Sequence, residues 1–441
     1  MRPRALTTFA ALAGTSVLAL AGCTGGGQAD KAPAADVTAA PEYSGTLSIL
    51  TKFAGEPLEP YFQDLAAEYE KLHPGVKIQL IQETDQSIKD KTKTLTASNA
   101  LPDVYFTWTG NWAENFVRGG RAADLSKVIG PGTEWGKTFS EGALSAFAYD
   151  GKYYGIPLYG NGKFMGYNKA AFAKAGVKVP ATFEDLIAAC GPLRKAGYEP
   201  IAFGNKDGWP ALHYLQQMFA YDVPWDTLQA DLKPATAKLD DPGYVTALTR
   251  FKTLVDTCTD TKSGTNGVLY SSAQEKFADG KAAMYYQEIL EFDNETAKGK
   301  LPTDDFGIFQ LPAPQGAKGD PTVIEGAPEG YLVNAASPRI PLAVDFMKFV
   351  TSEKNAKTLS SPPYGQPSTV IGAVTPETSS KAVYEGVGLV NKAPKLAAWL
   401  DTVTVPDVSD AWLSGGEALI TGGKTPEQVL ESVRQASASA K

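Results

Sequence analysis

The sequence contains few of the residues on which most metal sites and catalytic triads depend. It has three cysteines and two histidines, His73 and His213, in 441 residues, and these form no Cys/His cluster. A zinc site or a histidine-dependent triad is therefore difficult to assemble. We also find no nucleophile-elbow motif and no phosphate-binding loop. The sequence thus indicates neither a cofactor nor a metal, and no local motif marks a catalytic centre.

The chain also lacks an excess of positive charge. Its net charge is −8, its pI is about 5.1, and its basic residues are scattered. This balance argues against nucleic acid or an anionic membrane surface as a partner. Hydrophobic residues make up 43% and charged residues 20%, as in an ordinary globular protein. A chain of roughly 400 residues beyond its leader is too large for one compact core and is expected to form two lobes.

The first residues have the pattern of an export signal. Arg2 and Arg4 precede a short apolar run over residues 5–20, too short to span a bilayer comfortably. The sequence Leu20-Ala21-Gly22-Cys23 resembles the lipobox of bacterial lipoproteins. That resemblance implies a signal peptide over residues 1–22, a diacylglycerol on Cys23 and a flexible tether over residues 23–45. The alternative is an ordinary secretory signal with a chance cysteine.

Cys190 and Cys258 remain after the anchor. An exported chain meets an oxidising environment, so a disulfide between them is permitted. Sequence does not show whether their side chains meet, and a bridge and two buried thiols both stay open.

Strands and helices alternate near the start of the mature chain. Apolar strands are predicted at residues 47–50, 76–81 and 104–107, with helices between them. This order is typical of a parallel, doubly wound α/β sheet, whose ligands bind at the carboxyl ends of the strands. Those ends lie at residues 51–56, 83–86 and 107–111. A second α/β lobe is expected to begin near residue 160.

Several stretches, in this order, make the chain similar to the sugar-binding group of bacterial ABC-importer solute-binding proteins, which includes maltose-binding protein. These stretches are LPDVYFTW, DGKYYGIPLYGNGKFMGYNKAAFAKAG, FADGKAAMYY, FGIFQLPAPQG, YLVNAASP and GKTPEQVL. The resemblance implies a type II periplasmic-binding-protein fold: two α/β lobes joined by three crossing segments. We expect lobe 1 at residues 46–158 and 309–350, lobe 2 at 159–308 and 351–441, and crossings near 157–161, 308–311 and within 341–350.

The same resemblance implies a function and a location. The expected protein is a monomeric, extracytoplasmic, membrane-tethered binding protein rather than an enzyme, and it delivers a carbohydrate to the permease subunits of an importer. A tether to the membrane raises its concentration next to the permease. Capture is expected to occur by closure of the lobes around the ligand.

A sugar presents hydroxyls and weakly apolar CH faces, so its site needs flat aromatic rings and planar polar groups. Trp108 follows the third strand, at the end where a ligand should lie, and is predicted to stack on sugar. Trp209 follows a glycine loop of the second lobe, and the resemblance implies that it is the stacking aromatic there. Trp112, Trp399 and Trp412 are assigned to packing, and His213 and Lys52 are weaker candidates. The predicted polar and aromatic partners are Glu56, Glu83, Asn111, Asn161, Asp207, Tyr286, Glu288, Glu325 and Tyr364.

One departure from the family pattern leaves the ligand open. The family usually has glycine-X-tryptophan where this chain has Glu288, Ile289 and Leu290. Tyr286 and Glu288 are expected to replace that tryptophan, or else the ligand is smaller or of another kind. The alternatives are the same fold binding a polyamine through carboxylates and aromatics, and a surface glycosidase with two carboxylates about 5–10 Å apart.

Overall fold

The computed structural model describes residues 36–55 and 57–440. Within them, the first sheet has five strands in the order β2-β1-β3-β12-β6. β1 pairs in parallel with β2 and β3, as the alternating pattern predicts, whereas β12 is antiparallel to β3 and β6. These strands are β1 (Gly45–Thr51), β2 (Val76–Gln82), β3 (Val104–Thr107), β6 (Gly155–Tyr159) and β12 (Glu329–Val333). We call this sheet with its helices lobe 1.

The second sheet has four strands in the order β10-β7-β9-β8. They are β7 (Lys163–Asn168), β8 (Glu199–Ala202), β9 (Ala282–Glu288) and β10 (Phe306–Phe309). We call this sheet with its helices lobe 2. Short two-stranded pairs complete the strands: β4 (Ala148–Tyr149) with β5 (Lys152–Tyr153), and β11 (Ile324–Glu325) with β13 (Leu396–Ala397).

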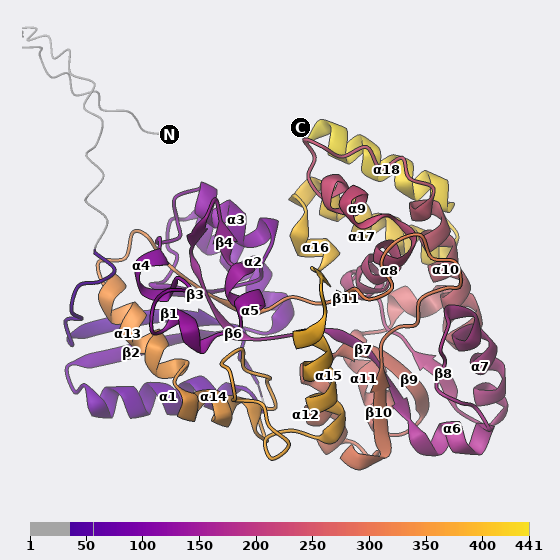
Figure 1. The fold of residues 1–441 in the computed structure, drawn as a ribbon, viewed down its shortest axis with the longest axis horizontal. Helices are drawn as coiled ribbons and strands as arrows, with labels where there is room; N and C mark the ends of the chain where they lie inside the picture. Colours follow the sequence, from indigo (N-terminus) through magenta and orange to yellow (C-terminus); the bar gives the residue numbers. More distant parts are fainter. Residues whose placement is uncertain (1–35, 56, 441) are drawn as a thin grey trace, which may run out of the picture. The chain divides into compact units, whose positions relative to one another are not determined.

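Helices flank both sheets (Figure 1). Those of lobe 1 are α1 (Glu59–Leu72), α2 (Asp85–Ala97), α3 (Asn111–Arg118), α4 (Ser126–Ile129), α5 (Glu141–Ser145), α13 (Ile340–Val350) and α14 (Glu353–Ser360). Those of lobe 2 are α6 (Lys169–Ala175), α7 (Phe183–Lys195), α8 (Trp209–Asp222), α9 (Trp225–Asp231), α10 (Gly243–Cys258), α11 (Tyr270–Ala278), α12 (Phe292–Lys298), α15 (Lys381–Lys392), α16 (Leu400–Val403), α17 (Pro406–Thr421) and α18 (Pro426–Ser439).

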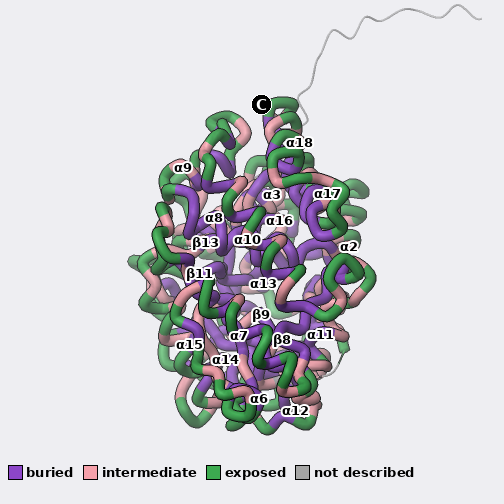
Figure 2. Tube along the Cα trace, turned by 90° about the vertical axis from the view of Figure 1, so that its right-hand side faces the viewer, coloured by how far each residue is buried: buried purple, intermediate pink, exposed green. Residues whose placement is uncertain are grey.

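The start of α2, which carries two pocket residues, is fixed locally. Thr84 caps α2 by accepting a hydrogen bond from the Ser87 amide, and the Ser87 hydroxyl accepts one from the Thr84 amide, which completes a capping box. Thr182 and Asp185 form the same arrangement at α7. Every residue of α8 is buried (Figure 2).

The hydrophobic residues gather around each sheet. One cluster surrounds the first sheet and a second surrounds α8 and α10, while a third covers β9 and β10 beneath α15. Cys190 on α7 and Cys258 on α10 are joined by a disulfide, which settles the pairing that the sequence left open. In the part of the chain that the structure describes, no helix is both long and apolar enough to cross a bilayer.

Two of the three crossings between the lobes lie further along the chain than the sequence predicts. The first crossing follows β6, as expected. The second is not at residues 308–311, because β10 pairs along its length with β7; it lies between β11 and β12. The third does not lie within α13: Leu359, Val370 and Ala373 still pack in the lobe 1 cluster, and lobe 2 resumes with α15.

The first two crossings touch each other. A Cβ atom added to Gly326 would lie 2.5 Å from the carbonyl oxygen of Asn161, a separation that real side chains do not adopt. Only glycine fits there without moving the backbone. The two connections are therefore in direct backbone contact beside the edge where the sheets meet.

Candidate binding site

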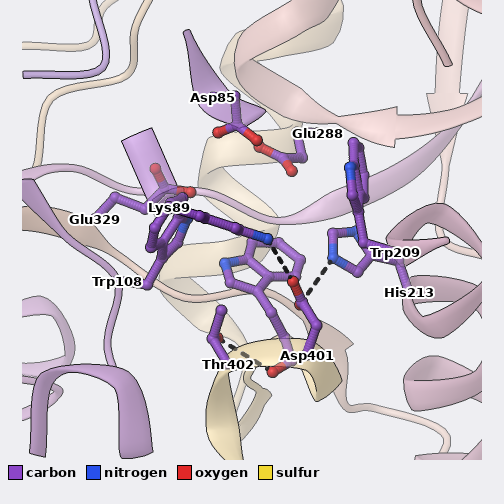
Figure 3. A pocket seen from close by; sticks show the side chains of 10 residues that line it. Asp85, Lys89, Trp108, Trp209, His213, Glu288, Glu329, Asp401 and Thr402 are labelled. Atoms are coloured by element: carbon purple, nitrogen blue, oxygen red, sulfur yellow. Dashed lines mark hydrogen bonds and ion pairs between the residues drawn. The ribbon is translucent and has the colours of Figure 1, made fainter. Parts of the chain in front are cut away.

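A pocket lies where the carboxyl ends of strands from both sheets converge, as expected for α/β sheets. Trp108 follows β3, and Glu329 opens the antiparallel β12 opposite that strand end. Glu288 ends β9 in lobe 2 and pairs with Lys163 of β7. The pocket has an empty volume of about 280 Å³ and is lined by Asp85, Lys89, Trp108, Trp209, His213, Glu288, Glu329, Trp399, Asp401 and Thr402 (Figure 3).

Three indole rings form much of this lining. Trp108 contacts Phe106 and Trp112 edge-on, with ring centroids 4.8 and 5.2 Å away. Trp209, the first residue of α8, has Tyr270 edge-on at 5.0 Å. Trp399 lies just before α16 and stacks on the His213 imidazole at 4.8 Å. Lobe 1 supplies Trp108 and lobe 2 supplies Trp209, so the rings come from both sides of the pocket.

Four carboxylates of the pocket are paired with lysines. The Lys52 ammonium lies 2.9 Å from Asp85 and 2.7 Å from Glu329. Lys89 lies 2.8 Å from Asp401, and the Lys163 ammonium is 3.9 Å from Glu288. These pairs are largely buried, and they leave lone pairs on the carboxylates that a hydroxyl donor can use.

Burial and ion pairing act in opposite directions on the pKa of Lys89, Asp401 and Glu329 in the pocket. Burial alone would lower the pKa of Lys89, but the Asp401 and Asp85 carboxylates outweigh it and raise that pKa above its ordinary value. Burial opposes ionisation of Asp401, yet the Lys89 ammonium and His213 hold its pKa below the usual range. Burial raises the pKa of Glu329 to about 7, against the influence of Lys52. The lobe-bridging pair Lys89–Asp401 is thus ionised near neutral pH.

The imidazole of His213 is held uncharged. Burial, aided by the Lys163 ammonium, lowers the pKa of His213 from 6.5 to about 4, although Asp401 acts in the opposite direction. Its Nε2 atom lies 3.6 Å from the Asp401 carboxylate. A neutral ring gives His213 one donor and one acceptor nitrogen for a polar ligand.

The predicted site residues divide into three groups. Trp108, Trp209 and Glu288 line the pocket together. Asn161, Tyr286 and Glu325 lie behind them in lobe 2: the Asn161 amide donates to Glu288, and the Tyr286 hydroxyl donates to Glu325 at 3.1 Å. The others are outside the lining: Glu83, Asn111, Asp207 and Tyr364.

Local contacts explain why those four lie elsewhere. Glu83 accepts a hydrogen bond from Ser87 at 2.7 Å, and Asn111 accepts one from Asn115 at 3.0 Å. The Asp207 carbonyl accepts from the Trp209 amide, within the turn before α8. Tyr364 packs edge-on against Tyr61 in the lobe 1 cluster. Glu56 and Cys23 lie outside the residues that the structure describes.

Five lining residues were not among the predicted contacts: Asp85, Lys89, Glu329, Asp401 and Thr402. Asp85 falls within residues 83–86, which the strand-end rule had marked, and Lys89 follows one helical turn later. Glu329 opens β12, a strand whose direction the sequence does not reveal. Asp401 and Thr402 follow Trp399 on α16 and have no local signal. Trp399 and His213, which we had ranked low, do line the pocket.

The family follows from comparison with known proteins. Residues 55–357 match the bacterial extracellular solute-binding protein family. The chain belongs to this family. Among its relatives, this solute-binding protein is 28% identical to a binding protein of Brucella abortus over 312 residues, covering 70% of this chain and 69% of that one. It is 24% identical to the diacetylchitobiose binding protein of Streptomyces coelicolor over 316 residues, 71% of each chain.

A solved structure supports the fold of this solute-binding protein. A chitin oligosaccharide binding protein superposes with a TM-score of 0.81 at 23% identity, covering 90% of this chain and 99% of that one. The two lobes therefore have the type II periplasmic-binding-protein fold that the sequence predicted.

Proposed function

We propose that this protein is the lipid-anchored binding component of an ABC importer and that it captures a carbohydrate in the pocket between its lobes. The observation that carries this proposal is the meeting of Trp108, Trp209 and Trp399 with four lysine-paired carboxylates in one pocket. Indole faces suit the CH faces of a sugar ring. Ion-paired carboxylates and lysines suit its hydroxyls, because hydrogen bonds to charged groups are the stronger ones.

The charge balance of the pocket favours a neutral ligand over a polyamine. Each of the four carboxylates already has a lysine ammonium as a partner, at 2.7–3.9 Å. A polycation would have to displace these lysines or lie beside them, whereas a neutral polyol adds hydrogen bonds without adding charge. The named ligands of relatives, such as diacetylchitobiose in Streptomyces coelicolor, are carbohydrates as well.

Binding is coupled to closure of the lobes. The crossings join the lobes beside the pocket, and a ligand that contacts both walls favours the closed form by its difference in affinity for the two forms. The closed form would then deliver the ligand to the permease subunits. The protein acts as a monomeric, extracytoplasmic carrier and carries out no reaction on its cargo.

A ligand screen tests the proposal. The exported chain carrying Cys23→Ala, which prevents acylation, is screened by thermal shift against mono- and oligosaccharides and against putrescine and spermidine. A tight ligand raises the melting temperature by mass action. We expect a rise with a saccharide; a rise with polyamines alone, or release of product from a glycan, would overturn the proposal.

The anchor is tested separately in cells. Cys23 in the lipobox-like stretch is proposed to carry the lipid, so metabolic labelling with palmitate should mark the chain and Cys23→Ala should abolish both label and membrane association. Label that persists in Cys23→Ala would contradict the anchor without affecting the binding site.

A further inference from the structure

Side chains of the protein itself cover one face of each indole in the pocket. The Lys89 ammonium lies 5.2 Å from the centre of the Trp108 ring. The Lys163 ammonium lies 5.1 Å from the centre of the Trp209 ring. Trp399 has the His213 imidazole stacked on it, with 24° between the ring planes. Each ring thus has one face taken before any ligand enters.

One of these side chains also crosses the pocket. Lys89 extends from α2 of lobe 1 to Asp401 on α16, as Figure 3 shows, and its ammonium is 2.8 Å from the carboxylate. α16 packs against α8 and α17 of lobe 2 and also against α3 of lobe 1, so this bridge joins α2 to a segment that contacts both lobes. The Asp401 side chain is only 7% exposed, and its second oxygen faces His213.

The space that remains is small. The empty volume of about 280 Å³ includes space that is open to solvent, so the enclosed space is smaller still. An oligosaccharide site needs an open end along which successive rings extend, and further indole faces for them. The Lys89–Asp401 bridge crosses the pocket (Figure 3), and the Lys89 ammonium covers a Trp108 face that an additional ring would use.

We propose that the Lys89–Asp401 bridge determines ligand length, so that the pocket takes a carbohydrate of one or two rings and excludes longer chains. This inference rests on the proposed function. Lys89 and Asp401 are the specificity-determining residues, and Lys89 limits length by occupying the Trp108 face and by reaching across the pocket to Asp401.

The test measures affinity against ligand length. Isothermal titration uses the glucose, xylose and N-acetylglucosamine series, each from one to four rings, with the wild-type chain, Lys89→Ala and the double variant Lys89→Ala/Asp401→Asn. The double variant leaves no unpaired charge buried, so it guards against a single variant that fails to fold. Lys91→Ala is the matched control, because Lys91 is on the same helix but pairs with Glu83 at 3.6 Å outside the pocket.

In whichever saccharide series binds, we expect the wild-type protein to bind the three-ring ligand about tenfold or more weakly than the best one- or two-ring ligand. Lys89→Ala and the double variant should reduce this ratio by about tenfold, while Lys91→Ala should leave it unchanged. Equal wild-type affinity for two and four rings would overturn the inference, as would an equal loss for all lengths in Lys89→Ala. No binding in any series would instead count against the proposed function itself.

Discussion

The two walls of the pocket differ in how their charged groups are paired. On the lobe 1 side, the Lys52 ammonium holds Asp85 and Glu329 at 2.9 and 2.7 Å. On the lobe 2 side, Lys163 approaches Glu288 only to 3.9 Å. Two buried polar atoms of the lining there, Asp401 Oδ1 and His213 Nδ1, also have no hydrogen-bond partner among the described residues.

This difference indicates separate roles for the two walls. A buried polar atom without a partner costs about 1–3 kcal/mol, and a ligand hydroxyl that reaches it removes that cost. Lobe 1 therefore offers a charge network that is already complete, whereas lobe 2 has more to gain from a ligand. We expect variants in lobe 2 to show the larger effects, and the predictions below test this expectation in descending order of size.

The largest effect is expected from the disulfide of lobe 2. Cys190 and Cys258 close a loop across a sequence separation of 68, for which the chain-entropy relation gives about 4 kcal/mol of stabilisation. Cys190→Ser/Cys258→Ser should lower the free energy of unfolding of lobe 2 by about this amount in urea titrations. Dithiothreitol should reproduce the loss in the wild type and add nothing to the variant. A variant as stable as the wild type would show that the bridge does not support lobe 2.

The second effect is a pH dependence carried by His213. Its pKa is about 4 in the folded protein, below its ordinary value of 6.5. Above pH 6.5 the ring is neutral in both states and contributes nothing. As the pH falls from 6.5 towards 4 the unfolded chain takes up a proton that the folded chain does not, so folding stability falls, by about 3 kcal/mol in all.

His213→Asn removes this contribution. Between pH 7 and pH 4 the wild type should lose about 3 kcal/mol more stability than His213→Asn, measured by urea unfolding at each pH. His73→Asn in lobe 1 serves as the control for removing a histidine outside the pocket. Parallel curves for the wild type and His213→Asn would refute the prediction.

The third effect concerns affinity. Trp209→Ala and Trp108→Ala should each weaken carbohydrate binding by about 1–3 kcal/mol, roughly 5- to 150-fold, as the loss of a stacking ring does elsewhere. The lobe 2 variant should show the larger loss. Trp225→Ala is the control, since Trp225 starts α9 outside the pocket lining. Calorimetry that gives wild-type affinity for Trp209→Ala would exclude this ring from the site.

The smallest effect compares the two capping boxes. Thr84→Ala on α2 and Thr182→Ala on α7 should each cost about 1 kcal/mol of stability, because each leaves a helix amide without its acceptor. Only Thr84→Ala should also change affinity, since α2 positions Asp85 and Lys89 in the pocket. Equal affinities for the two variants would show that the start of α2 does not tune the site.

The sequence predicted the parts of the molecule that local signals specify. Periodicity predicted β1, β2 and β3 with the helices between them, and the order of these elements predicted their parallel pairing. The rule that ligands lie at strand ends placed Trp108 and drew attention to the residues around Asp85. The order of motifs along the chain gave the fold and the family.

The features that the sequence did not predict depend on contacts between segments far apart in the chain, and such contacts leave no local signal in the sequence. Asp401 meets Lys89 only because α16 packs on α8, more than 300 residues after α2 in the chain. The second crossing was misplaced because the apolar run at β10 does not reveal that it pairs with β7 rather than joining the first sheet. Glu329 was missed because nothing local shows that β12 runs antiparallel.

The position of β12 has a consequence for the order in which the molecule can mature. β12 lies inside the first sheet, between β3 and β6, yet it comes from residues 329–333. The second sheet takes all its strands from residues 163–309. As the chain is synthesised and exported from its N-terminus, the first sheet therefore stays incomplete until residues 329–333 are available. The second sheet begins later in the sequence, but all its strands are available before then.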